Sequence, residues 1–114
     1  MRRRIVLPLP AGPGQRDDTL SMAILTYLGV GISAYPTRLQ DALSNYVGRE
    51  HAALLRERAE ALLLEVAITG DQILNTVEFD EVLRRTAAQI RTAHPELSDD
   101  AVRALLWDYS YSNR

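Results

Sequence analysis

The chain has 114 residues, of which 46% are hydrophobic and 25% charged, close to the average of globular proteins. This length fits one domain with a real hydrophobic core. The absence of cysteine excludes disulfides, thiolate zinc ligands and cysteine nucleophiles. All 13 basic residues are arginine, which a GC-rich genome explains better than selection for bidentate anion contacts.

The start of the chain predicts an irregular basic tail, residues 1–17, ahead of a single helical domain, residues 18–114. Prolines and glycines in the tail exclude a regular helix. Residues 1–16 hold no acid and carry a net charge of +4, whereas the remainder holds all 15 acids and carries −6. We therefore expect the tail to dock on the acidic body or on a partner, with Ile5-Val6-Leu7 as its apolar anchor. Its positive charge comes from Arg2, Arg3, Arg4 and Arg16.

Two apolar stretches decide the expected location of the protein. The run from Ile5 to Leu9 contains a proline and is shorter than the roughly 7–15 residues of a secretory signal's apolar region. The stretch from Ala23 to Ala34 is interrupted by polar residues and glycines and is too short to span a bilayer. We expect a cytoplasmic protein that does not insert into a membrane.

The body predicts an all-α fold, a compact bundle of five or six helices. Asp18 or Thr19 can cap the first helix, and Gly29 with Gly31 should end it. Its apolar face recurs at helical spacing, although Thr26–Ser33 could instead form a strand. The residues of that face are Leu20, Ala23, Ile24, Tyr27 and Leu28.

Thr37 and Gln40 have the spacing of a capping box, which predicts the start of a second helix that ends at Gly48. The third helix, from Arg49 to Ile68, should be the longest. Its buried stripe is predicted to be Leu55, Ala59, Leu62, Leu63 and Val66, with Leu62 and Leu63 nearly fully buried.

The end of the third helix is apolar on nearly every side from Ala61 to Ile68, which predicts a central place in the bundle. Thr69-Gly70-Asp71 then combines a stop, a glycine and a new cap. A short helical turn through Asn75 should follow it.

The last two helices have clear boundaries. One should run from Glu78 to Ala93 and end at His94-Pro95, because the residue before proline avoids helical angles. Ser98 should cap the final helix, with Asp99 and Asp100 in its first turn. The core stripes are Phe79, Val82, Leu83, Thr86 and Ile90, then Val102, Leu105, Leu106 and Tyr109.

Neither histidine predicts a catalytic or metal site. His51 and the adjacent Glu50 diverge by about 100° on a helix, so they do not converge on one atom. His94 fits the cap of a helix C-terminus, where the dipole stabilises positive charge. The acidic pairs Asp17-Asp18, Asp80-Glu81 and Asp99-Asp100 fall at helix starts. We expect no catalytic, metal or cofactor-binding residue.

Arg84, Arg85 and Arg91, followed by a turn and a last helix, permit a helix-turn-helix interpretation. In that motif the N-terminal residues of the second helix face the bases. Here Asp99 and Asp100 would face phosphates, and the acidic body lacks a broad basic surface, so nucleic acid is a disfavoured partner.

The C-terminal aromatics are the most unusual local feature. Trp107 and Tyr111 are four residues apart and point away from the core stripe that Tyr109 continues. They form either a second packed face or an exposed aromatic patch of the kind enriched in interface hot spots. We take Trp107 and Tyr111, together with Arg2, Arg3, Arg4, Ile5 and Leu7 of the tail, as candidate partner-binding residues.

These observations predict a non-catalytic helical protein that binds another protein or forms a homo-oligomer. A bacterial immunity or antitoxin-like protein, or an accessory subunit of a larger assembly, fits the small size and the acidic body. Two alternatives stay open: a DNA-binding transcriptional regulator, and a small enzyme that uses His51 or His94.

Overall fold

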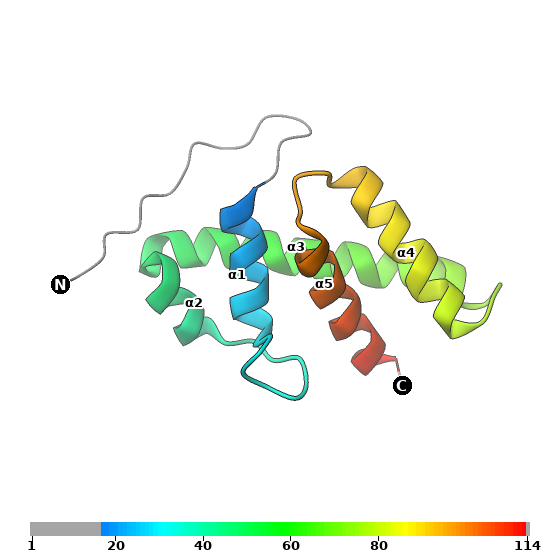
Figure 1. The fold of residues 1–114 in the computed structure, drawn as a ribbon, viewed down its shortest axis with the longest axis horizontal. Helices are drawn as coiled ribbons and strands as arrows, with labels where there is room; N and C mark the ends of the chain where they lie inside the picture. The colour runs from blue at the N-terminus through cyan, green and yellow to red at the C-terminus, as the bar shows by residue number, and fades with distance from the viewer. Residues whose placement is uncertain (1–16, 114) are drawn as a thin grey trace.

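A computed structural model describes residues 17–113, and within them the secondary structure is five helices and no strand (Figure 1). This confirms the predicted all-α bundle, with five helices. The expected basic tail, with Arg2, Arg3, Arg4, Ile5 and Leu7, lies outside the described residues. The helices are α1 (Asp18–Leu28), α2 (Gln40–Val47), α3 (Arg49–Leu74), α4 (Phe79–Ala93) and α5 (Asp99–Ser112).

Helix α3 is the central element. Its 26 residues make a rod about 39 Å long. The rod packs against all four other helices, with α1 and α2 toward its N-terminal half and α4 and α5 toward its C-terminal half (Figure 1). The predicted stripe is buried, including Leu62 and Leu63 at 7% exposure each, and the full set is Ala52, Leu55, Ala59, Leu62, Leu63, Val66 and Gly70.

The central place expected for residues 61–68 is confirmed, because α3 contacts all four other helices. Two apolar side chains of this segment are nevertheless uncovered: Leu64 is 62% exposed and Ile68 is 51% exposed. They lie on a face of α3 that the other helices leave open.

The predicted stop at Thr69-Gly70-Asp71 was wrong, and so was the separate short turn after it, because α3 continues to Leu74. Gly70 is buried inside the helix against the ring of Tyr109 from α5. A Cβ atom at Gly70 would lie 2.7 Å from the Tyr109 hydroxyl oxygen and 2.8 Å from its Cε2 atom. The glycine therefore serves a close approach of two helices. Asp71 does not cap a helix; it accepts a 2.9 Å hydrogen bond from the Tyr109 hydroxyl.

Helix α1 begins at Asp18, as expected, but its N-cap is neither of the two residues predicted. Asp17 is the N-cap, and its carboxylate accepts a 2.9 Å hydrogen bond from the Leu20 amide. Gly29, in the left-handed conformation at φ 78°, ends the helix as predicted. No strand forms at residues 26–33, because this stretch completes α1 and then turns.

The predicted capping box of Thr37 and Gln40 was also wrong. Leu39 is the N-cap of α2 and gives no side-chain hydrogen bond. The amides of Thr37 and Leu39 instead donate to the carbonyls of Leu28 and Tyr27, at 3.0 and 2.7 Å. These bonds satisfy the end of α1 and hold the segment beside it, so Thr37 cannot turn its hydroxyl to α2. The remaining predicted boundaries, at Gly48, His94 and Ser98, are confirmed.

Arg38 joins three helices from the connection between α1 and α2. Its guanidinium contacts Glu60 of α3 at 3.1 Å and Asp108 of α5 at 2.7 Å, and it lies 6.0 Å from the centre of the Tyr27 ring. The Tyr27 hydroxyl donates to the same Glu60 at 2.7 Å. Burial, followed by this hydrogen bond, raises the pKa of Tyr27 to about 12. Burial and the bond to Asp71 raise the pKa of Tyr109 to about 12 in the same way.

The contact between Gly70 and Tyr109 can be tested by a double-mutant cycle. Glycine to alanine inside a helix ordinarily stabilises by about 1 kcal/mol. We expect Gly70→Ala to destabilise the protein by roughly 1–3 kcal/mol, because the new methyl group overpacks the ring. In a Tyr109→Ala background the ring is gone, and Gly70→Ala should be stabilising. Urea unfolding of the four proteins measures both values, and the same sign in both backgrounds would contradict the contact.

The two buried tyrosines should weaken the fold at alkaline pH. Ionisation of its five tyrosines raises the absorbance near 295 nm, while its one tryptophan adds a background that does not titrate. Because the pKa values of Tyr27 and Tyr109 rise to about 12 on folding, the unfolded chain loses these protons first. The free energy of unfolding should then fall as the pH rises from about 10 toward about 12. Tyr27→Phe and Tyr109→Phe should each remove part of the absorbance step near pH 12, and an unchanged step in both variants would refute the shifts.

Candidate functional site

Trp107 and Tyr111 lie together on α5, away from its buried stripe. Their rings meet edge to face, with centroids 6.1 Å apart and planes at 83°. Trp107 is half-buried and Tyr111 is 39% exposed. The Tyr111 hydroxyl donates a 3.3 Å hydrogen bond to the carbonyl of Ala34, in the connection between α1 and α2. Tyr111 therefore joins α5 to that connection, while Trp107 also packs against the hydrophobic core.

Trp107 lines a hollow of about 430 Å³ between the end of α1, the connection that follows it and α5. This volume falls within the range of about 300–1,000 Å³ found for ligand-binding clefts. We call it the Trp107 pocket, and its lining residues are Leu25, Val30, Gly31, Ser33, Asp100, Arg103, Ala104 and Trp107.

The edge of the Trp107 pocket carries exposed aliphatic side chains. Val30, which lines it, is 42% exposed, and Ile32, between two lining residues, is 75% exposed. Gly29 and Gly31 take φ values of 78° and 82°, a conformation that L side chains avoid, and the chain reverses there. A tight turn thus holds two aliphatic residues toward solvent beside a half-buried tryptophan.

The pocket is lined by one acidic and one basic side chain, Asp100 and Arg103, on a body that is acidic as a whole. Asp100 and Arg103 lie 3.7 Å apart on its rim, and each side chain is 74% exposed, so the pair contributes little to stability. Residues 17–113 hold all 15 acids of the chain but only eight arginines, a net charge of −7. This field favours a positively charged ligand surface.

His94 makes contacts that the sequence did not reveal. As predicted, His94 is the C-cap of α4. Its ring lies between two carboxylates. Nε2 contacts Glu65 of α3, and Nδ1 lies 3.1 Å from Glu96. Both ring nitrogens are thus engaged, which leaves none to face a substrate. His51 is exposed, and residues 17–113 contain no group of three or more side chains placed to hold a metal ion.

The arginines of the helix-turn-helix interpretation are engaged within the chain. Arg84 and Arg85 contact Glu81, and Arg91 lies 3.3 Å from Asp99. Helix α5, which would have to enter a DNA groove, buries much of its surface in the core and opens with Asp99 and Asp100. This geometry disfavours DNA binding through these residues.

Comparison of the chain with protein-family models, curated proteins and solved structures found no match. In the described part of the chain, none of the helices combines the length and the apolar character needed to cross a bilayer. The case for a functional site therefore rests on the geometry of the Trp107 pocket.

Substitution of His94 tests its structural role. His94→Ala should cost about 1–2 kcal/mol, because Glu65 and Glu96 both lose a partner that ties α3 to the turn after α4. The matched control His51→Ala removes an exposed histidine and should change stability by no more than about 0.5 kcal/mol. Urea unfolding at neutral pH measures both. Equal effects of the two substitutions would argue against the link.

Proposed function

We propose that this protein is a non-catalytic, cytoplasmic interaction protein that binds another protein through the Trp107 pocket. A bacterial accessory subunit, or an immunity or antitoxin-like protein, fits this description. The observation that supports it is the position of Trp107 in a mostly apolar hollow, where Val30 is also exposed. Tryptophan in a partly enclosed pocket is typical of interface hot spots.

The chemistry of the pocket defines the kind of partner. Leu25, Ala104 and Trp107 offer an apolar surface to one aliphatic or aromatic side chain. Asp100 and Arg103 balance each other on the rim, and the excess of acids on the body favours arginine or lysine beside that anchor. The expected partner surface is therefore an amphipathic segment with an apolar anchor and a basic flank.

The first residues of the chain have the same chemistry as this expected partner surface. Ile5-Val6-Leu7 is an apolar triplet that directly follows Arg2, Arg3 and Arg4. If this segment fills the pocket, Trp107 is a folding residue and not a partner contact. The experiment must therefore separate an external partner from the chain's own start.

Trp107→Ala distinguishes these cases when the product of the neighbouring gene is used as the binding partner. We expect it to weaken that complex by about 2 kcal/mol or more, roughly 30-fold, with little change in melting temperature. Val30→Ser should also weaken binding, since Val30 lines the pocket and is 42% exposed. Tyr35→Ala is the matched control, because Tyr35 is 61% exposed and does not line the pocket.

Trp107 fluorescence shows whether an external partner or the chain's own first residues fill the pocket. It is the only tryptophan of the chain, so its emission reports on this pocket alone. Emission should shift to the blue when the partner is added. If deletion of residues 1–16 shifts emission to the red, and Trp107→Ala lowers the melting temperature without affecting binding, the pocket belongs to the chain's own start and the proposal fails.

A further inference from the structure

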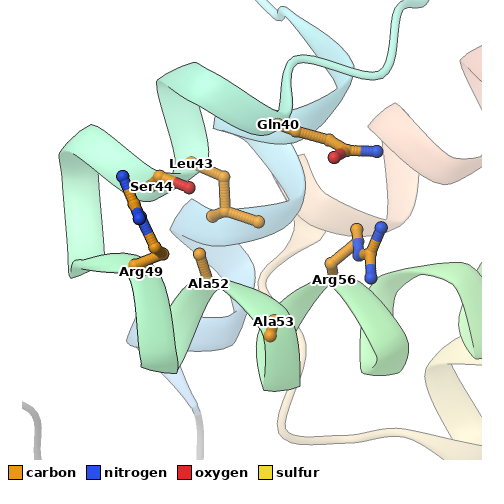
Figure 2. Close-up of a pocket in the computed structure, with 7 residues that line it drawn as sticks. All are labelled: Gln40, Leu43, Ser44, Arg49, Ala52, Ala53 and Arg56. Carbon is orange, nitrogen blue, oxygen red and sulfur yellow. The ribbon is translucent and has the colours of Figure 1, made fainter.

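A second hollow, of about 180 Å³, lies between α2 and the first turns of α3 (Figure 2). It is smaller than the clefts that hold drug-sized ligands, so only a small molecule or a short side-chain group fits it. Its lining residues are Gln40, Leu43, Ser44, Arg49, Ala52, Ala53 and Arg56. We call it the Arg49–Arg56 pocket.

The two arginines of this pocket differ from every other arginine that the structure describes. All acids of the sequence lie within residues 17–113, so each possible Asp or Glu partner is described. Six of the eight described arginines have a carboxylate within 4.0 Å, and the two that have none are Arg49 and Arg56. The six paired arginines are Arg38, Arg58, Arg84, Arg85, Arg91 and Arg103.

Local sequence explains why neither arginine has a carboxylate within 4.0 Å. On a helix, a carboxylate three or four residues away can reach an arginine. Ala52 and Ala53 occupy these positions after Arg49, and the same two residues occupy them before Arg56. Glu60, four residues after Arg56, is already bound to Arg38 and to the Tyr27 hydroxyl. Because their side chains are small, the two alanines also leave room for the hollow between α2 and α3.

The two guanidinium groups occupy opposite ends of the hollow. Arg49 and Arg56 both rise from α3 toward α2, with Leu43 and Ala52 between them (Figure 2). Their seven-residue spacing corresponds to about 10.5 Å along the helix. Ser44 lies beside Arg49, and Gln40 lies beside Arg56, so each end has a neutral polar group as well (Figure 2).

The positive charge at one end of the hollow comes from Arg49 itself and not from a helix dipole. Arg49 is the first residue of the 26-residue helix α3, and Gly48 is both the N-cap of α3 and the C-cap of α2. The positive end of the α3 dipole and the negative end of the α2 dipole therefore meet beside Arg49 and partly offset each other.

We propose that the Arg49–Arg56 pocket binds a short dicarboxylate, with one carboxylate on each arginine. The planar fork of a guanidinium matches a carboxylate in bidentate geometry. The hydrocarbon spacer of the ligand lies beside the exposed Ala53, above a floor formed by the buried Leu43 and Ala52, and none of the three has a polar side chain. A single phosphate would engage one end and leave the other arginine unpartnered, so two separated anionic groups fit better. The same pair of carboxylates can come from a free diacid or from two acidic residues of a peptide.

Titration of the full chain with succinate, glutarate, adipate and pimelate tests this proposal. Acetate and inorganic phosphate serve as comparison anions at constant ionic strength, and acetyl-Asp-Gly-Asp-amide represents the peptide source. We expect at least tenfold tighter binding of the best diacid than of acetate, with an optimum at one chain length. Amide chemical shifts of residues 40–56 should move at the same midpoint as the calorimetric signal.

Matched charge substitutions then locate the site. Arg49→Gln and Arg56→Gln should each weaken diacid binding by tenfold or more, and Arg56→Lys should weaken it less, because the charge remains without the fork. Arg84→Gln removes the same charge at a distant, 77% exposed side chain and should leave affinity unchanged. Arg49 is exposed and Arg56 half-buried, so these variants should fold, which circular dichroism checks.

Three results would overturn the proposal. The first is no binding of any diacid or of the peptide at millimolar concentration. The second is tighter binding of phosphate than of every diacid, which would indicate a site for one anionic group. The third is equal weakening by Arg84→Gln, which would show that only net charge was measured. A preference for the peptide over all free diacids would support the same chemistry and assign it to an acidic protein segment.

Discussion

The close approach of Tyr109 to Gly70 determines how the rest of the molecule is arranged. Helix α3 must stay continuous for 26 residues to meet the other four helices, and α5 must cross it where a side chain would leave no room. A glycine that keeps helical geometry satisfies both demands, at a cost in helix propensity of about 1 kcal/mol. The ring offsets that cost through burial, its bond to Asp71 and stacking on Phe79 at 6.3 Å. Once Tyr109 fixes the rotation of α5, Trp107 is turned toward the connection after α1.

That connection is held at several points, which matters for the Trp107 pocket. Its far end is fixed by the backbone bonds of Thr37 and Leu39 to α1 and by Arg38, which contacts α3 and α5. Its middle is bonded through the carbonyl of Ala34 to Tyr111. The wall of the pocket is thus formed before any ligand arrives. A preformed wall reduces the ordering cost of binding, so a modest apolar contact at Trp107 can yield useful affinity.

The sequence predicted those features that depend on local periodicity and failed where two distant segments meet. The buried stripes of α3, α4 and α5 and the caps at Gly29 and Ser98 follow from spacing within one helix. Gly70 was misread because glycine favours both a helix stop and a close helix contact, and only the position of Tyr109 decides between them. His94 and Glu65 are 29 residues apart, so no local pattern could pair them. The sequence placed Trp107 off the core stripe but gave no sign of the connection that completes its pocket.

The strongest argument that the two hollows bind ligands comes from exposed aliphatic side chains and from arginines without a carboxylate partner. Six of the eight described arginines have a carboxylate partner, and most aliphatic side chains of the described helices are covered. Among the residues that depart from this pattern, Val30 lines the Trp107 pocket, and Arg49 and Arg56 line the second pocket. Other aliphatic side chains are exposed without lining either pocket, namely Met22, Ile32, Leu54, Leu64 and Ile68. Exposure alone is therefore weak evidence, and it becomes an argument for binding only where shape and charge agree with it.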